Sequence, residues 1–213
     1  MKIAIVGDVH MHFKGLAYIV RTHSPDVILQ CGDFGYWPKD NNYNIDYCKN
    51  GQTKIYFCDG NHEDHESLRS LTSNEIHPNI YYQPRGSILK LGDYNILFMG
   101  GAHSVDKSQR TPGYDWFPEE NISERDLYNI PDERIDIVIS HTSPVEFDFE
   151  KYSITEKKND GNRKYLSCIL DTYKPKLWYF GHWHTNDWGK YNDCIWYAMN
   201  QIDGQGKGYL RWL

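Results

Sequence analysis

The sequence has no long hydrophobic run. No stretch of its 213 residues approaches the roughly 20 apolar residues that a membrane-spanning helix requires. After Met1 and Lys2, the first apolar run ends at Val6, which is too short for the hydrophobic region of a secretory signal. We therefore expect a soluble, cytoplasmic protein without a membrane partner.

Cysteine pairs and excess positive charge are also missing. The five cysteines show no CxxC spacing, and Cys31 and Cys58 lie in strand-like runs where small buried thiols are expected, so a reducing compartment fits. The formal net charge of −6 disfavours a broad electrostatic hold on nucleic-acid backbone. A nuclease or nucleic-acid-binding metalloprotein therefore stays an alternative rather than the main hypothesis.

No linker-like change of composition, internal repeat or low-complexity tract divides the chain. Because 39% of the residues are hydrophobic, which is enough for a packed core, we expect a single domain over residues 1–213. Two long polar loops, near residues 103–123 and 150–163, are predicted to form lids over a site. The sequence does not indicate an oligomeric state.

Five short apolar runs each end in polar side chains. Residues 16–23, between the first two runs, have helical spacing, and strand–helix–strand order is typical of parallel strands. Because the carboxyl ends of parallel strands form a common ligand-binding crevice, we expect the polar groups to converge there. The runs are residues 2–6, 27–29, 55–57, 135–139 and 177–180, and the groups that follow them are Asp8 and His10, Asp33, Asn61 to Glu63, His141, and His182 and His184.

The remaining segments follow simpler patterns. Strands are predicted at residues 80–82, 87–91 and 95–99, where turn residues indicate antiparallel pairing, and near Ile195 and Tyr209. Helices are predicted at residues 43–49, around Leu68, after Ser123 and at residues 165–170.

The polar groups at the strand ends are nitrogen and oxygen donors. Asp8 and His10, two residues apart, face the same side of an extended segment and can bind one ion together. The mixture lacks thiolate, so it favours Mn²⁺, with iron, zinc and nickel as alternatives, over calcium. Each motif alone also fits a surface pair or a core histidine. The other donors are a carboxylate able to bridge two cations, an amide oxygen and three imidazoles: Asp33, Asn61, His141, His182 and His184.

Together the motifs resemble those of the calcineurin-like metallophosphoesterases, especially small bacterial and phage members. The resemblance implies an α/β (α+β) fold, a four-layer α/β/β/α sandwich of two mixed β-sheets flanked by helices, and a dinuclear metal centre. The motifs are Asp8-Val9-His10, Gly32-Asp33, Gly60-Asn61-His62-Glu63, His141 and Gly181-His182-Trp183-His184. By this resemblance the first ion is held by Asp8, His10, Asp33 and His184, and the second by Asp33, Asn61, His141 and His182.

The implied activity is metal-dependent hydrolysis of a phosphomonoester or a small phosphodiester, for example a nucleotide. Two divalent ions bring four positive charges, and Asp8, Asp33 and a bridging hydroxide remove three, so about one remains to attract phosphate. The hydroxide is expected to attack in line with the leaving group. His62 is the candidate general acid, and the alternative is a histidine that only hydrogen-bonds phosphate. For Glu63 we favour capping of the following helix over orientation of His62.

Substrate contacts are expected from Asn61, His62 and Arg110. Arg110 can clamp a phosphate bidentately, and the alternative is a solvated surface arginine. Four aromatic residues are candidates for a pocket that stacks a nucleobase, although core packing is expected for at least half of them. These are Tyr36, Trp37, Trp116 and Trp183. Surface positions are expected for His12, His65 and His77, and the place of His103 is left open.

One motif departs from a known branch of the family. Ser/Thr protein phosphatases carry a GDxVDRG pattern, whereas here Gly32-Asp33 continues as Phe34-Gly35-Tyr36-Trp37. A Ser/Thr-type protein phosphatase is therefore an alternative only. A second alternative is a non-catalytic interaction module that has kept the fold.

Overall fold

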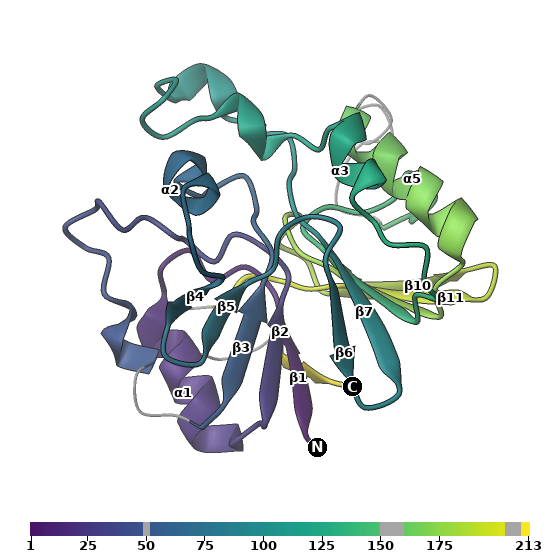
Figure 1. Ribbon diagram of the computed structural model, residues 1–213, viewed down its shortest axis with the longest axis horizontal. Coiled ribbons are helices and arrows are strands. Elements are labelled where there is room, and N and C mark those ends of the chain that lie inside the picture. The colour runs from purple at the N-terminus through teal and green to yellow at the C-terminus, as the bar shows by residue number, and fades with distance from the viewer. Residues whose placement is uncertain (49–51, 150–159, 203–209) are drawn as a thin grey trace.

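Two mixed β-sheets lie face to face, with helices on both outer sides (Figure 1). The computed structural model describes residues 1–48, 52–149, 160–202 and 210–213. The first sheet has six strands in the spatial order β12 (Leu210–Trp212), β1 (Ile3–Val6), β2 (Val27–Gln30), β3 (Lys54–Phe57), β5 (Ile80–Tyr82) and β4 (Glu75–His77). The second has six in the order β10 (Asp187–Tyr191), β11 (Cys194–Ala198), β9 (Leu177–Phe180), β8 (Ile137–Ser140), β7 (Tyr94–Met99) and β6 (Ile88–Leu91).

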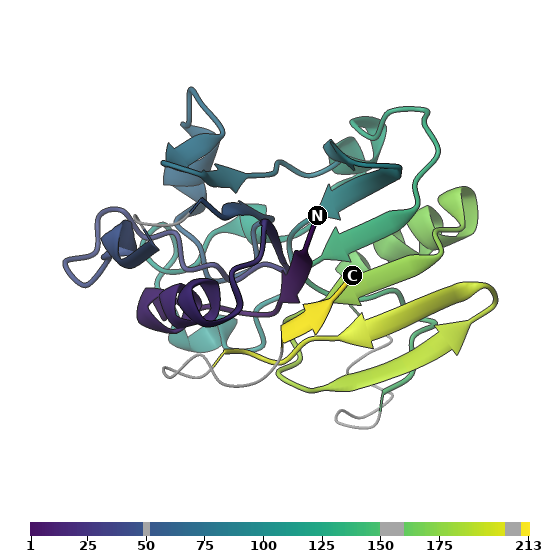
Figure 2. The ribbon, with the colours of Figure 1, turned by 90° about the horizontal axis from the view of Figure 1, so that it is seen from below.

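The centre of each sheet is parallel and its edges are antiparallel. In the first sheet β1, β2, β3 and β5 run parallel, and β12 and β4 pair antiparallel at the two edges. Figure 2 shows β12 beside β1. In the second sheet β11, β9, β8 and β7 run parallel between the antiparallel edges β10 and β6. The predicted sandwich of two mixed sheets is confirmed.

Two longer helices cover the outer faces of the sheets. α1 (Phe13–His23) lies against the first sheet and α5 (Gly161–Tyr173) against the second (Figure 1). Shorter helical segments are η1 (Ile45–Cys48), α2 (His65–Arg69), η2 (Lys107–Gln109), η3 (Pro118–Glu120) and α3 (Glu124–Tyr128). In the described part of the chain, no helix has the length and apolar character needed to cross a bilayer.

Alternating side chains of the central strands build three apolar layers. Ile3 and Ile5 of β1 point between the sheets, where they join Ile137 and Ile139 of β8. The other side chains of β1 face outward and pack against α1, in a layer that includes Leu16. Because both faces are covered, the central strands read as continuous apolar runs in the sequence. Cys31 and Cys58 are buried, as predicted.

Several predicted elements differ from the structure. A helix is predicted over residues 43–49, but in the described part, residues 43–48, only the 3₁₀ turn η1 forms, and the sequence pattern does not predict the edge strands β4 and β10. Edge strands carry polar residues on their open side, so they lack the apolar signal. The predicted loop near 150–163 lies mostly outside the described residues, and α5 already begins at Gly161, with Asp160 as its N-cap.

Candidate metal centre

The candidate ligands follow the carboxyl ends of five parallel strands. Three of these strands, β1, β2 and β3, belong to the first sheet, and β8 and β9 belong to the second. Since the two sheets face each other, their polar strand ends meet at one edge of the sandwich. The structure brings all seven predicted ligands together there: Asp8, His10, Asp33, Asn61, His141, His182 and His184.

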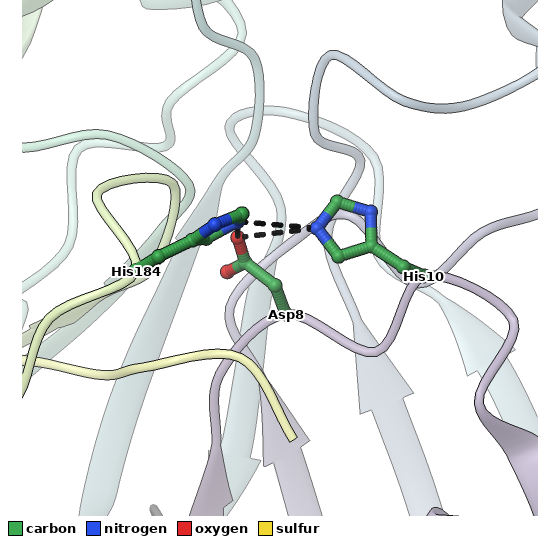
Figure 3. A group of neighbouring side chains, drawn as sticks. All are labelled: Asp8, His10 and His184. Atoms are coloured by element: carbon green, nitrogen blue, oxygen red, sulfur yellow. Dashed lines mark hydrogen bonds and ion pairs between the residues drawn. The ribbon is translucent and has the colours of Figure 1, made fainter. Parts of the chain in front are cut away.

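Asp8, His10 and His184 form one group, in which the two imidazoles flank the carboxylate (Figure 3). Nε2 of His184 lies 3.0 Å from Oδ2 of Asp8 and 3.2 Å from Nε2 of His10. Nε2 of His10 is 3.7 Å from the same Asp8 oxygen. One candidate ligand atom from each residue lies within 4.8 Å of the other two, which is compatible with a shared cation.

A second group lies around the amide of Asn61. Its Oδ1 is 3.0 Å from Nε2 of His141 and 3.0 Å from Nδ1 of His182. The Nδ1 of His141 lies 2.8 Å from the carbonyl oxygen of Cys31, an acceptor that turns the opposite nitrogen toward the site. This group therefore presents imidazole nitrogen and amide oxygen to one point.

Asp33 lies between the two groups. Its Oδ2 is 3.7 Å from Nε2 of His10, and its Oδ1 is 3.3 Å from Nε2 of His141. Oδ1 also accepts the backbone N–H of His62 at 2.8 Å. The carboxylate thus presents one oxygen to each group. Asp8 also lies close enough to Asp33 and His141 for the three to share a cation. Its Oδ1 accepts the backbone N–H of His182 at 3.0 Å.

The buried carboxylate of Asp33 and the imidazole of His141 influence each other's charge. Burial alone would raise the pKa of Asp33, but the imidazoles of His141, His62 and His10 hold that pKa well below its usual range. Burial alone would lower the pKa of His141, yet the Asp33 carboxylate raises the pKa to about 10. Each group therefore favours the charged form of the other.

Several candidate ligands have an unusual backbone conformation. The φ angles of His10, Asp33, His182 and His184 are 47°, 51°, 65° and 44°, in the left-handed region that non-glycine residues rarely adopt. Two glycines allow the carboxylates of Asp33 and Asp8 to lie close to the backbone of a neighbouring segment. A Cβ at Gly60 would lie 2.0 Å from Oδ1 of Asp33, and one at Gly181 would lie 2.0 Å from Oδ1 of Asp8.

Glu63 does not cap the following helix, so that prediction is wrong. The N-cap of α2 is Asp64, whose Oδ1 accepts the backbone N–H of Ser67 at 2.9 Å. The carboxylate of Glu63 is fully buried and accepts three backbone N–H groups at 2.9 Å, from residues 34–36. Glu63 therefore holds the loop that follows Asp33, which places that carboxylate.

A buried hydrogen-bond chain orients Asn61 through Ser104 and Glu120, two residues for which no role was predicted. Nδ2 of Asn61 donates to the hydroxyl of Ser104 at 3.1 Å, and that hydroxyl donates to Oε2 of Glu120 at 2.7 Å. The other Glu120 oxygen accepts the backbone N–H of Ser104 at 2.9 Å. Because the amide nitrogen is bound on one side, the amide oxygen must face the histidines.

A buried ion pair fastens the base of the 103–123 segment. Arg85 donates to Oδ2 of Asp59 at 3.0 Å from Nε and 2.6 Å from Nη2, and it also donates to the backbone carbonyls of residues 119–121. Burial alone would raise the pKa of Asp59, but the Arg85 guanidinium holds that pKa below its usual value. The pair thus ties the segment to the chain that leads from β3 to Asn61.

His62 and Arg110 lie beside the ligands and contact each other. The ring of His62 is 5.1 Å from the ring of His10, and its Nδ1 is 2.9 Å from Nη2 of Arg110. Arg110 also contacts both carboxylate oxygens of Asp106, at 2.9 Å from Nε and 2.8 Å from Nη2. Burial lowers the pKa of His62, and the Arg110 and His10 charges lower it further, against the effect of Asp33. Arg110 is therefore part of the site and not a solvated surface arginine.

The predicted aromatic residues divide between core and pocket. A hollow of about 630 Å³ adjoins His62 and Arg110, and of the four candidates only Trp37 lines it. Trp183 is buried in the core of the second sheet, and Tyr36 packs against the core of the first. Trp116 lies under the ammonium of Lys107, 4.1 Å from the ring centre. Core packing for at least half of the four is confirmed.

His65 is buried, contrary to the surface position that the sequence analysis predicted. Its side chain is 2% exposed, and Nδ1 lies 3.9 Å from Oδ2 of Asp59. Its Nε2 has no hydrogen-bond partner within the described ranges. Burial lowers the pKa of His65 to about 4, although Asp59 acts in the opposite direction. His12 is exposed as predicted, and His77 is partly buried.

Acid is expected to destabilise the fold through His65. Its pKa is about 4 when folded and roughly 6.5 when unfolded, so the unfolded chain binds the proton more tightly. The contribution is present above pH ~6.5 and is lost as the pH falls toward 4, by about 3 kcal/mol at most. The free energy of unfolding, measured with urea between pH 4 and 8, should depend less steeply on pH for His65→Gln than for the parent chain. Equal slopes for the variant and the parent chain would contradict this assignment.

Comparison with known proteins identifies the family. The sequence matches the calcineurin-like phosphoesterase family over residues 1–186. The chain belongs to this family and is a metallophosphoesterase, a metal-dependent phosphoester hydrolase. The resemblance inferred from the strand-end motifs is therefore confirmed.

Solved structures share the fold at low sequence identity. TT1561 of Thermus thermophilus is 13% identical, with a TM-score of 0.61, over 100% of this chain and 97% of the other. The phosphopantetheinyl hydrolase of Mycobacterium tuberculosis is 13% identical, with a TM-score of 0.58, over 100% and 95%. An archaeal phosphodiesterase is 12% identical, with a TM-score of 0.51, over 95% and 85%. A comparison with curated proteins gives no match.

Proposed function

We propose that the protein hydrolyses a phosphomonoester or a small phosphodiester at a centre of two divalent metal ions. The observation that carries the proposal is the position of Asp33, whose two oxygens face different donor groups. Asp8, His10 and His184 complete the first site. Asn61, His141 and His182 complete the second.

The donor chemistry fits divalent transition metals. The seven side chains supply carboxylate oxygen, amide oxygen and imidazole nitrogen without thiolate, which favours Mn²⁺, with iron, zinc and nickel as alternatives. Asp8 and Asp33 are almost completely buried, and a buried carboxylate pair is costly without compensating positive charge. When bound, two such ions activate water for attack and neutralise the charge that develops on the phosphoryl group.

We propose that His62 is the general acid, which donates a proton to the leaving group. Its ring lies beside the Arg110 guanidinium, with both ring nitrogens near Nη2, and its centre is 5.1 Å from that of the His10 ring. A bound phosphate brings negative charge to the ring and so favours the protonated imidazole, which can then donate to the departing oxygen. In this proposal Asn61 also contributes to substrate binding, from its position between His141 and His182.

In this proposal Arg110 contributes mainly its positive charge to phosphate binding, and not two unengaged N–H donors. Its donors already engage Asp106, and Nη1 donates to the backbone carbonyl of Asn61 at 3.1 Å. The guanidinium is therefore held in place before substrate arrives. This arrangement reduces the entropy that is lost when phosphate binds.

The substrate class remains a phosphorylated small molecule or a nucleotide. The two relatives described as a phosphodiesterase and a phosphopantetheinyl hydrolase support small phosphoesters. We further propose that residues 1–213 form one cytoplasmic domain and that residues 103–123 act as a lid.

A phosphoester assay tests the proposal. Protein freed of metal and then loaded with Mn²⁺ should hydrolyse 4-nitrophenyl phosphate or bis(4-nitrophenyl) phosphate. A chelator should abolish turnover, and renewed Mn²⁺ should restore it. Metal analysis of the loaded protein should give two ions per chain. Turnover that survives the chelator, or one ion per chain at full activity, would refute the dinuclear mechanism.

Glu120→Gln is expected to weaken the binding of one ion. The neutral amide no longer accepts both the N–H and O–H of Ser104, so Asn61 loses its fixed orientation. The Mn²⁺ dissociation constant of the weaker site should rise by about 10- to 100-fold, as measured by isothermal titration calorimetry. The control is Glu119→Gln, a change of the same chemistry at an exposed neighbour. Equal Mn²⁺ affinities in both variants would remove Glu120 from this role.

A further inference from the structure

The hollow beside His62 is large enough to hold an organic group. Its volume is about 630 Å³, within the range of small-molecule sites. One wall comes from residues 106–117 of the proposed lid, and the other comes from residues 37–40 and 62–66. The hollow, here called the lid pocket, therefore lies outside the metal ligands and adjoins them.

The reaction geometry directs the leaving group into the lid pocket. This step rests on the proposed function. If the phosphoryl group sits at the metal ligands and His62 protonates the departing oxygen, that oxygen must lie at His62. Because His62 and Arg110 both line the lid pocket, the organic part of the substrate extends from that oxygen into the pocket.

The lid pocket carries an excess of negative charge. Its acidic side chains are Asp40, Asp64, Glu66, Asp106 and Asp115. Its two cationic side chains are already paired: Lys39 lies 2.9 Å from Glu66, and Arg110 lies 2.8 Å from Asp106. In the described part of the chain no ion pair reaches Asp40 or Asp115. An anionic leaving group would meet repulsion there, whereas a cationic one would be attracted.

Aromatic side chains form the apolar part of the same pocket. The indole N–H of Trp37 donates to the carbonyl of His62 at 3.0 Å, which fixes the ring beside the general acid. Phe117 is 7% exposed and closes the wall, while Tyr114 is 77% exposed at the rim. Such walls favour flat organic groups because aromatic rings bury large areas at little entropic cost.

We propose that the lid pocket is a leaving-group site that selects flat, uncharged or cationic organic groups and rejects anionic ones. Phosphate monoesters of neutral or amine-bearing alcohols that carry an aromatic ring, including nucleosides, fit this selection. Nucleoside diphosphates, whose leaving group is itself a phosphate, and acidic phosphopeptides do not.

Three phenyl phosphates that differ only in a side-chain charge test the assignment. The probes are the phosphate esters of tyramine, 4-ethylphenol and 3-(4-hydroxyphenyl)propionic acid, assayed with the Mn²⁺-loaded protein at low salt. Their phenol leaving groups are closely similar, so differences in kcat/KM report on the pocket. We expect the ammonium probe to exceed the carboxylate probe by at least about tenfold, with the ethyl probe between them. Added salt should reduce the ratio.

Variants locate the effect. The double substitution Asp40→Asn and Asp115→Asn should lower the ammonium-to-carboxylate ratio several-fold, because it removes two negative charges from the pocket. Each amide oxygen can still accept the local backbone N–H, so the local structure is kept. Asp193→Asn, on an 82% exposed side chain outside the pocket, is the matched control and should leave the ratio unchanged.

The outcomes separate this inference from the proposed function. Equal rates for all three probes, or preference for the carboxylate, would overturn the pocket assignment while leaving phosphoester hydrolysis intact. An ammonium preference that the double substitution does not reduce would also overturn it. No turnover of any probe, together with no turnover of 4-nitrophenyl or bis(4-nitrophenyl) phosphate, would overturn the proposed function, and the pocket assignment with it.

Discussion

Asp33→Asn is expected to lower kcat/KM for 4-nitrophenyl phosphate by at least about 10³-fold, or roughly 4 kcal/mol of transition-state stabilisation. The amide has one acceptor oxygen and no charge, so it can serve one of the two donor groups that Asp33 now faces at 3.7 and 3.3 Å. The remaining ligands keep part of the affinity for metal. We therefore expect the variant to hold fewer than two ions at Mn²⁺ concentrations that fill the parent chain.

Kinetics and metal content must be measured on the same samples. Asp171→Asn, at an exposed position of α5, is the matched control and should behave like the parent chain. Near-ultraviolet circular dichroism establishes that the Asp33→Asn variant is folded. A folded variant with two ions and an unchanged rate would eliminate Asp33 as the bridging ligand.

His62→Ala is expected to lower kcat by about 10²- to 10⁴-fold for an alkyl phosphate, whose leaving oxygen must be protonated. The loss should be much smaller for 4-nitrophenyl phosphate, because nitrophenolate departs without a proton. This difference distinguishes a general acid from a histidine that only hydrogen-bonds phosphate. In the latter case both substrates lose the same factor.

The expected metal content of His62→Ala is two ions, since His62 is not assigned as a ligand. Arg110 loses a neighbour in this variant, but its contacts with both oxygens of Asp106 remain to hold it. His23→Ala, at the far end of α1, is the matched control. An identical reduction for alkyl and nitrophenyl phosphates would assign His62 to phosphate binding alone.

The ligand positions were predictable because each follows an apolar run. Ile3 and Ile5 lie between the sheets, and Ala4 and Val6 face α1, so β1 must be buried on both sides and Asp8 must emerge at its end. The same logic applies to Asp33 after β2. Parallel pairing then brings these ends together without further information.

Polar contacts between distant loops were not predictable in this way. Glu63 follows His62 and precedes a helix, so helix capping was the simplest interpretation, yet its carboxylate binds the backbone after Asp33. Glu120 lies in a long polar segment, and nothing in its neighbours indicates that it reaches Ser104. Such pairings depend on how loops cross in space, which hydrophobic periodicity does not encode.

The proposed ligands of each ion come from both halves of the sandwich: His184 from the second sheet meets Asp8 from the first, and His141 meets Asn61. If the ions are bound as proposed, separating the halves releases them, and by mass action free divalent cations oppose that separation. We therefore expect resistance to heat and proteolysis to increase with the supply of divalent cations. A chain without bound metal is expected to unfold and to be digested more readily, in addition to losing catalysis.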